Sequence, residues 1–134
     1  DYTLARVFNI FGGNDQFSVI SKLVKREPNE EFVLLNNGAS KRDYIHVDDV
    51  AHAIKSLVGV TNMPELDIGT GTAASMSQII KFLGSNGFPI KIVNTNTDAQ
   101  IGASVADTSR LLGFIGKDYN FKSVYDYLHA ELIK

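Results

Sequence analysis

Residues 41–60 read KRDYIHVDDVAHAIKSLVGV, and within them a strand pattern passes directly into a helix pattern. Tyr44–Val47 is typical of a short strand. Asp48 or Asp49 is then expected to cap a helix, because aspartate is among the best N-cap residues. The buried face of this helix is predicted from apolar residues at helical spacing: Val50, Ile54, Leu57 and Val58. A strand that leads straight into an amphipathic helix indicates an α/β fold.

The same alternation continues toward the N-terminus. Thr3–Ile10 is apolar at nearly consecutive positions, which predicts a strand buried on both faces of a parallel sheet. Apolar residues from Phe17 to Val24 recur at helical spacing, and that helix should end before Pro28. Phe32–Leu35 is predicted to be another short strand.

The pattern is similar toward the C-terminus. Leu66–Ile68 and Ile90–Val93 are expected to be strands, and Ser75 with Gln78 has the spacing of a capping box. Asp107 is expected to cap a short helix closed by Gly113, and a last helix begins near Lys122. We therefore predict one α/β domain over residues 1–134, with short, mostly parallel strands and flanking helices.

Composition excludes several classes of function. The chain has 134 residues, with 13 Lys plus Arg against 15 Asp plus Glu, so its net charge of −2 favours neither nucleic acid nor an anionic membrane as a partner. There are 0 Cys, which rules out disulfides, thiolate metal sites and cysteine nucleophiles. No apolar run is long enough to span a bilayer. These features fit a cytoplasmic protein.

Three motifs each allow two interpretations. Gly69-Thr70-Gly71 after a strand has the outline of a dinucleotide-binding loop, but a plain strand-to-helix turn is favoured. His46 to His52, with two aspartates between them, could hold a metal, although helix capping is the better interpretation. Lys41-Arg42-Asp43 could hold a phosphate through the bidentate fork of Arg42, or it could be a solvated charge pair with Asp43 as partner.

Four motifs occur in one order that resembles the extended short-chain dehydrogenase/reductase family of NAD-dependent nucleotide-sugar epimerases and dehydratases. They are RVFNIFG at 6–12, KRDYIHVDDVA at 41–51, DIGTG at 67–71 with Ser75 after it, and VADTS at 105–109. The resemblance covers nearly the whole chain and corresponds to the C-terminal, substrate-binding portion of a Rossmann-type enzyme.

The resemblance implies roles for four residues. Asn9 matches the family residue that contacts the nucleotide-sugar, and Arg42 matches the one that reaches its diphosphate. Phe8 lies where the family backbone passes the nicotinamide, and Lys22 is a looser candidate for a substrate contact. The sequence departs from the family at Asp67, where Asn is usual.

A second departure concerns Thr97 and Gln100, which lie where a second phosphate-binding Arg is usual. The diphosphate contact would then rest on Arg42.

The family's Gly-rich cofactor loop and its Tyr-x-x-x-Lys pair lie upstream of RVFNIFG, and the chain contains neither. We therefore expect no catalytic residue and no metal ligand here, NAD(P) bound by the intact parent but not by this chain alone, and no turnover. Strands at Val7–Asn9 and Leu66–Ile68 would be the last of the parent's sheet. Self-association or the missing N-terminal part is expected to cover them.

Two alternative functions remain open, and neither is that of a substrate-binding portion of an enzyme. One is a stand-alone dinucleotide-binding module that uses Gly69-Thr70-Gly71. The other is a non-catalytic interaction domain with the same fold, because function depends on the site and not on the fold.

Overall fold

The structure, a computed structural model, describes residues 2–98 and 102–134. The strands are β1 (Leu4–Val7), β2 (Asn9–Phe11), β3 (Glu31–Leu35), β4 (Lys41–His46), β5 (Glu65–Ile68), β6 (Ala73–Ser75), β7 (Lys91–Thr95) and β8 (Ala103–Ser104). The helices are α1 (Val19–Lys25), α2 (Val47–Leu57), α3 (Met76–Ser85), α4 (Ser109–Ile115) and α5 (Val124–Leu132). Four of the five strand pairings in the described part are parallel, which confirms the predicted α/β class.

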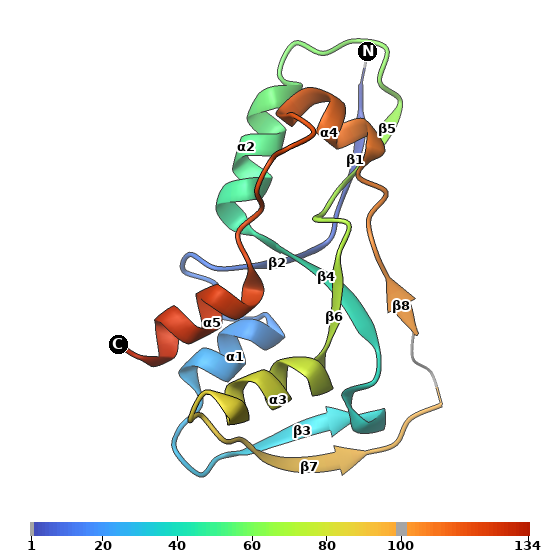
Figure 1. Cartoon of the computed structure of the whole chain (residues 1–134). Helices are drawn as coiled ribbons and strands as arrows, with labels where there is room; N and C mark the ends of the chain where they lie inside the picture. Colours follow the sequence, from blue (N-terminus) through green and yellow to red (C-terminus); the bar gives the residue numbers. More distant parts are fainter. Residues whose placement is uncertain (1, 99–101) are drawn as a thin grey trace.

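The strands form three small sheets along the molecule (Figure 1). β1 pairs with β5 at one end and β3 pairs with β7 at the other. Between them lies β4, which pairs with β2, β6 and β8. One apolar core gathers side chains of α1, α3 and α5, and a second core gathers those of α2, α4 and β5. β4 contributes to both cores and therefore connects the two ends.

The prediction of a strand buried on both faces at Thr3–Ile10 is wrong. β1 ends at Val7, and the chain then crosses at Phe8 to begin β2 at Asn9 in a different sheet, so Val7–Asn9 is not one strand. Leu4 is 55% exposed and Val7 40%. The reason is that, in the described part of the chain, neither apolar core includes a side chain of β1, which lies at the edge of a two-stranded sheet.

Helix α2 begins differently from its prediction. His46 is the N-cap, and its Nδ1 accepts a hydrogen bond from the main-chain N–H of Asp48 at 3.1 Å. Asp48 and Asp49 lie in the first turn instead of capping it. Ile54 and Val58, predicted to be buried, are exposed, because the inward face of α2 carries Asp49, Val50 and Ala53.

Two other helix ends differ from expectation, and one agrees. α1 begins after Ser18, which leaves Phe17 86% exposed outside it. α4 runs through Gly113 to Ile115, and its N-cap is Thr108. The capping box of Ser75 and Gln78 is confirmed, with bonds of 2.9 and 3.1 Å. Across residues 2–98 and 102–134, no helix combines the length and apolar character that crossing a bilayer requires.

Candidate functional site

The centre of the molecule is the carboxylate of Asp43 in β4, which is completely buried. Oδ1 accepts hydrogen bonds from the main-chain N–H and the hydroxyl of Thr70, at 2.9 and 2.7 Å. Oδ2 accepts from the N–H groups of Gly71 at 2.8 Å and Ala106 at 3.1 Å. A buried charge requires such donors to offset its desolvation. Asp43 therefore joins three segments that are far apart in the sequence.

The loop Gly69-Thr70-Gly71 is built around this carboxylate. A Cβ at Gly69 would lie 2.5 Å from Cβ of Ala106 and 2.8 Å from Oδ2 of Asp43, so only glycine fits. The next element is strand β6, and the helix that follows is capped by Ser75. The amides of Thr70 and Gly71 that a pyrophosphate would need are already bonded to Asp43, which favours the structural turn over a cofactor loop.

Asn9 and Phe8 lie together at the crossing between β1 and β2. Asn9 donates from Nδ2 to the main-chain oxygen of Asp43 at 3.0 Å. The main-chain N–H of Phe8 donates to the carbonyl of Ile68 at 3.0 Å, and its side chain is half-buried. Both residues line an open hollow of about 300 Å³ with Ser104. The two residues that the resemblance assigned to cofactor and substrate are therefore neighbours.

Arg42 is half-buried in β4, directly before Asp43. Its Nη1 donates to the carbonyl of Lys41 at 2.9 Å. It lines a hollow of about 190 Å³ together with Tyr44 and side chains of β3. The interpretation of Asp43 as the charge partner of Lys41 and Arg42 is wrong, because its carboxylate points to the Thr70 loop instead.

Lys22 is exposed on α1 and lines a different hollow, of about 450 Å³. This hollow and the hollow of Arg42 share three lining residues, Val19, Phe32 and Val33, so the two are adjacent. The structure therefore brings Asn9 next to Phe8 and couples Asn9 to the strand of Arg42 through Asp43. Lys22 lines the adjacent hollow from α1.

The region expected to hold a second phosphate contact is bonded to the turn Asn36–Gly38, of which Gly38 lines the hollow of Arg42. The main-chain N–H of Thr97 donates to Oδ1 of Asn36 at 2.8 Å, and the main-chain oxygen of Thr97 accepts from Nδ2 of Asn36 at 2.8 Å. Gln100 lies outside the described residues. Tyr44 also lines the hollow of Arg42 and was not predicted to do so, although residues two apart on one strand lie on the same side of it.

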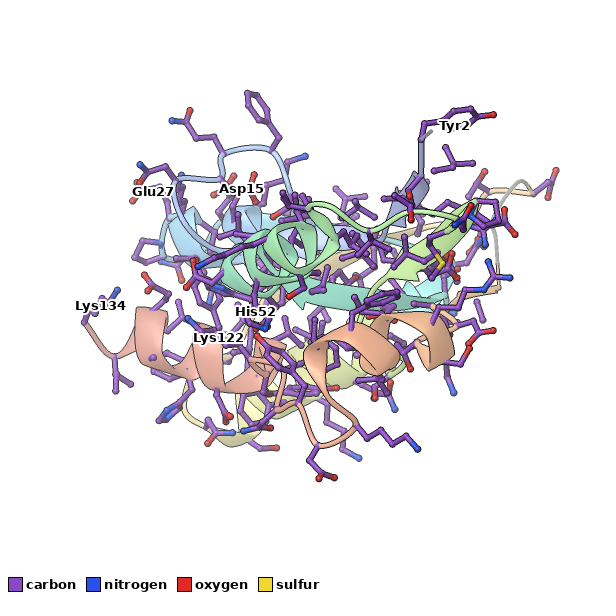
Figure 2. All side chains as sticks on the ribbon, turned by 90° about the horizontal axis from the view of Figure 1, so that it is seen from above. Tyr2, Asp15, Glu27, His52, Lys122 and Lys134 are labelled. Carbon is purple, nitrogen blue, oxygen red and sulfur yellow. The ribbon has the colours of Figure 1, made fainter. Side chains whose placement is uncertain are left out.

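The residues considered as metal ligands make hydrogen bonds and ring contacts within the chain. Asp49 is buried and accepts from the hydroxyl of Tyr119 at 2.7 Å and from the N–H of Lys122 at 2.9 Å. The ring of His52 stacks on that of Tyr119 with centroids 5.0 Å apart. His52 and Lys122 are both labelled in Figure 2. Burial, followed by the bond to Asp49, raises the pKa of Tyr119 to about 12. No metal-type cluster of three ligands occurs in the described ranges.

Asp67, the departure from the family pattern, is compensated by Arg6. The guanidinium Nε of Arg6 donates to Oδ1 of Asp67 at 2.6 Å, and the N–H of Asp107 donates to Oδ2 at 3.0 Å. Burial alone would raise the pKa of Asp67, but these two donors outweigh it and lower the pKa below its ordinary value. The carboxylate thus ties β1 to β5 and to the segment before α4.

The sequence and the fold of the chain are similar to those of known proteins. A model of the NAD dependent epimerase/dehydratase family matches residues 1–66. GDP-6-deoxy-D-talose 4-dehydrogenase of Aggregatibacter actinomycetemcomitans is 31% identical over 132 residues, which is 91% of this chain and 44% of that protein. The chain thus spans less than half the length of this curated relative.

Solved structures share the fold. UDP-glucuronic acid 4-epimerase of Bacillus cereus superposes with a TM-score of 0.82 at 19% identity, over 98% of this chain and 44% of its own. UDP-glucose 4-epimerase of Thermotoga maritima gives a TM-score of 0.78 at 22% identity, over 98% and 45%. At this identity the likeness is one of fold.

Proposed function

Because the chain belongs to the NAD-dependent epimerase/dehydratase family, we propose that it is the part of such an enzyme that binds a nucleoside-diphosphate sugar. The observation that carries the proposal is the link between Asn9 and the strand of Arg42. The amide of Asn9 is bonded to the main chain of Asp43, the residue next to Arg42. The two candidate substrate contacts therefore sit on one rigid unit. The curated relative, named for a GDP-sugar, is consistent with this ligand class.

Arg42 is proposed to bind the diphosphate, and Asn9 to bind the sugar-nucleotide. A guanidinium presents two parallel N–H donors that match a phosphate, which an ammonium cannot do. Lys22 is proposed as an additional cation at the far end of the adjoining hollow. Because the net charge of the chain is −2, an anionic ligand must be bound by individual cationic side chains such as Arg42, and not by a positive electrostatic field of the whole chain.

The cofactor NAD(P) fits these residues only in part. The backbone and ring of Phe8 border a hollow that could accept the edge of a nicotinamide. The amides of the Gly69-Thr70-Gly71 loop are bonded to Asp43, so they do not fit a pyrophosphate. When bound in an intact enzyme, NAD(P) supplies hydride transfer. We propose that this chain alone binds no cofactor and turns over no substrate, because its sequence contains no Tyr-x-x-x-Lys pair.

The partner is proposed to be an N-terminal cofactor-binding part or, in its absence, a second copy of the chain. The chain covers 44–46% of the length of the solved relatives, so more than half of each of those chains has no counterpart here. The exposed side chains of β1, with Leu4 at 55%, offer an apolar surface for it. Figure 2 shows Tyr2, just before β1, standing away from the rest of the molecule.

Calorimetric titration with UDP-, GDP-, ADP- and dTDP-sugars tests the proposal. We expect one class to bind, and Arg42→Ala to weaken it at least about tenfold, as loss of a charge-assisted hydrogen bond does. Lys41→Ala is the matched control, because Lys41 is the exposed cation next to Arg42 in β4 and does not line its hollow. Binding that ignores Arg42, or turnover with added NAD, would contradict the proposal.

A further inference from the structure

The hollow that contains Lys22 has an unusual mixture of charges. Its lining combines the apolar side chains of Val19, Phe32 and Val33 with five charged ones: Lys22, Lys25, Arg26, Glu30 and Glu31. A phosphate in this place would meet two carboxylates. A flat polar ring with donors and acceptors on its edge would meet a partner of each kind and an apolar surface for its faces.

Strand β3 provides the side chains that reach from this hollow to Arg42. Glu31, Val33 and Leu35 alternate along β3, so they lie on one side of the strand. Val33 is 57% exposed and lines both hollows, while Leu35 lines the hollow of Arg42. In the described part, β3 pairs with β7 on one edge and leaves its other edge without a strand. A ligand with a ring at Glu31 and a diphosphate at Arg42 would follow this side of β3.

Glu31 is the carboxylate at the start of β3 that lines this hollow. Its Oε1 is 2.6 Å from Nζ of Lys91, its register partner on β7. Glu30 has a different task, because its Oε2 accepts from the main-chain N–H of Glu27 at 3.0 Å and closes the turn before the strand.

We propose that the hollow selects guanine, with Glu31 as the residue that determines specificity; this rests on the proposed function. Guanine presents two adjacent donors, N1–H and the 2-amino group, to which a single carboxylate can bind with both oxygens. Uracil presents one N–H between two carbonyls, and adenine presents one amino group beside an acceptor. Lys22 on α1 and Arg26, the extended residue that directly follows this helix, both line the hollow and supply cations for O6 and N7; Nη2 of Arg26 also donates to the carbonyl of Pro89 at 3.3 Å.

Titration of the chain with GDP, UDP and ADP by calorimetry tests the assignment. We expect GDP to bind at least about tenfold tighter than UDP, since a site built for hydrogen bonds rejects a ligand that cannot make them. In Glu31→Gln, the amide nitrogen would face a guanine donor. The preference for GDP should therefore fall to about threefold or less, with UDP affinity unchanged.

Two control variants separate the carboxylate from its surroundings. Lys91→Met removes the exposed ion pair and keeps Glu31, and Glu30→Gln keeps an oxygen for the Glu27 N–H. Both should retain the preference for GDP. Equal binding of GDP and UDP, both dependent on Arg42, would overturn the guanine assignment and leave the proposed function standing. A GDP preference that survives in Glu31→Gln would overturn the role of Glu31. Binding of none of the nucleotides would overturn both proposals.

Discussion

Asp43 makes two hydrogen bonds to Thr70: one carboxylate oxygen accepts both the main-chain N–H and the hydroxyl of that residue, at 2.9 and 2.7 Å. Asp43 directly follows Arg42, and its own carbonyl holds Asn9. The loop at Thr70 is therefore the support on which the candidate substrate contacts depend. Asp43, for which the sequence allowed the role of partner in a solvated charge pair, is instead fully buried, and its carboxylate accepts four hydrogen bonds.

Asp43→Asn should destabilise the chain by about 3 kcal/mol, because an amide nitrogen would replace one acceptor oxygen and leave two buried donors unsatisfied. Urea unfolding followed by circular dichroism measures this loss. Asp118→Asn is the control, since Asp118 is exposed, and it should change stability by less than about 0.5 kcal/mol. Equal effects of the two substitutions would show that the buried bonds contribute little.

Two glycine-to-alanine substitutions should act in opposite directions. At Gly69 a Cβ would lie 2.5 Å from Cβ of Ala106, and such overpacking costs about 1–3 kcal/mol. At Gly113, inside α4, a Cβ has nothing within 4 Å, so alanine should stabilise the helix by about 0.5–1 kcal/mol. Thermal unfolding of the two variants gives the sign directly, and a stabilised Gly69→Ala would refute the close packing of the loop.

Stability should fall in acid through Asp67. Its pKa is lowered in the folded state, because the N–H of Asp107 and Arg6 outweigh the effect of burial. The stabilising contribution is therefore complete above the ordinary value of 3.8 and is lost as the pH falls through the lower folded value. Urea midpoints between pH 6 and 2 measure this loss. Asp67→Asn should flatten the acid limb, and an unchanged limb in this variant would assign the loss to other carboxylates.

Tyr119 should dominate the behaviour in alkali. Its pKa is raised to about 12 by burial and by its bond to Asp49. The neutral form is therefore favoured in the folded state, and its contribution is present below pH 10 and lost as the pH rises toward 12. Burial also raises the pKa of Tyr44, Tyr125 and Tyr127, so ultraviolet titration should show several late phenols, and the one that titrates near 12 should be absent in Tyr119→Phe. Loss of the hydrogen bond should also cost this variant about 1 kcal/mol at neutral pH.

The alternation of strands and helices could be predicted because it depends on local apolar spacing, which is confirmed for β3, β5 and α5. The role of His46 as a cap could not, since it depends on the rotamer of an aromatic ring that also packs between Phe11 and Tyr127. The exposure of β1 could not be predicted either, because an apolar run does not indicate whether other elements cover the two faces of the strand.

In the candidate site too, one feature could be predicted from the sequence and others could not. The identity of Arg42 suggested its ligand, because a guanidinium has few alternatives for binding a diphosphate. The support from Asp43 depends on donors 27 to 63 residues away, which no local pattern reveals. The adjacency of the Lys22 and Arg42 hollows also arises only from the packing of α1 beside β3.

The open edge of β1 predicts that the chain associates. Leu4 and Val7 of β1 are 55% and 40% exposed, and an apolar edge strand tends to pair with another chain. Sedimentation velocity over a wide concentration range should therefore show species larger than one chain, in reversible exchange. The double substitution Leu4→Lys and Val7→Lys should shift the chain to a monomer, because paired charges on an edge oppose strand addition. Val58→Lys, at an 80% exposed position after α2, should leave the association unchanged. A wild-type chain that stays monomeric throughout would contradict this role of β1 and leave its apolar side chains to solvent.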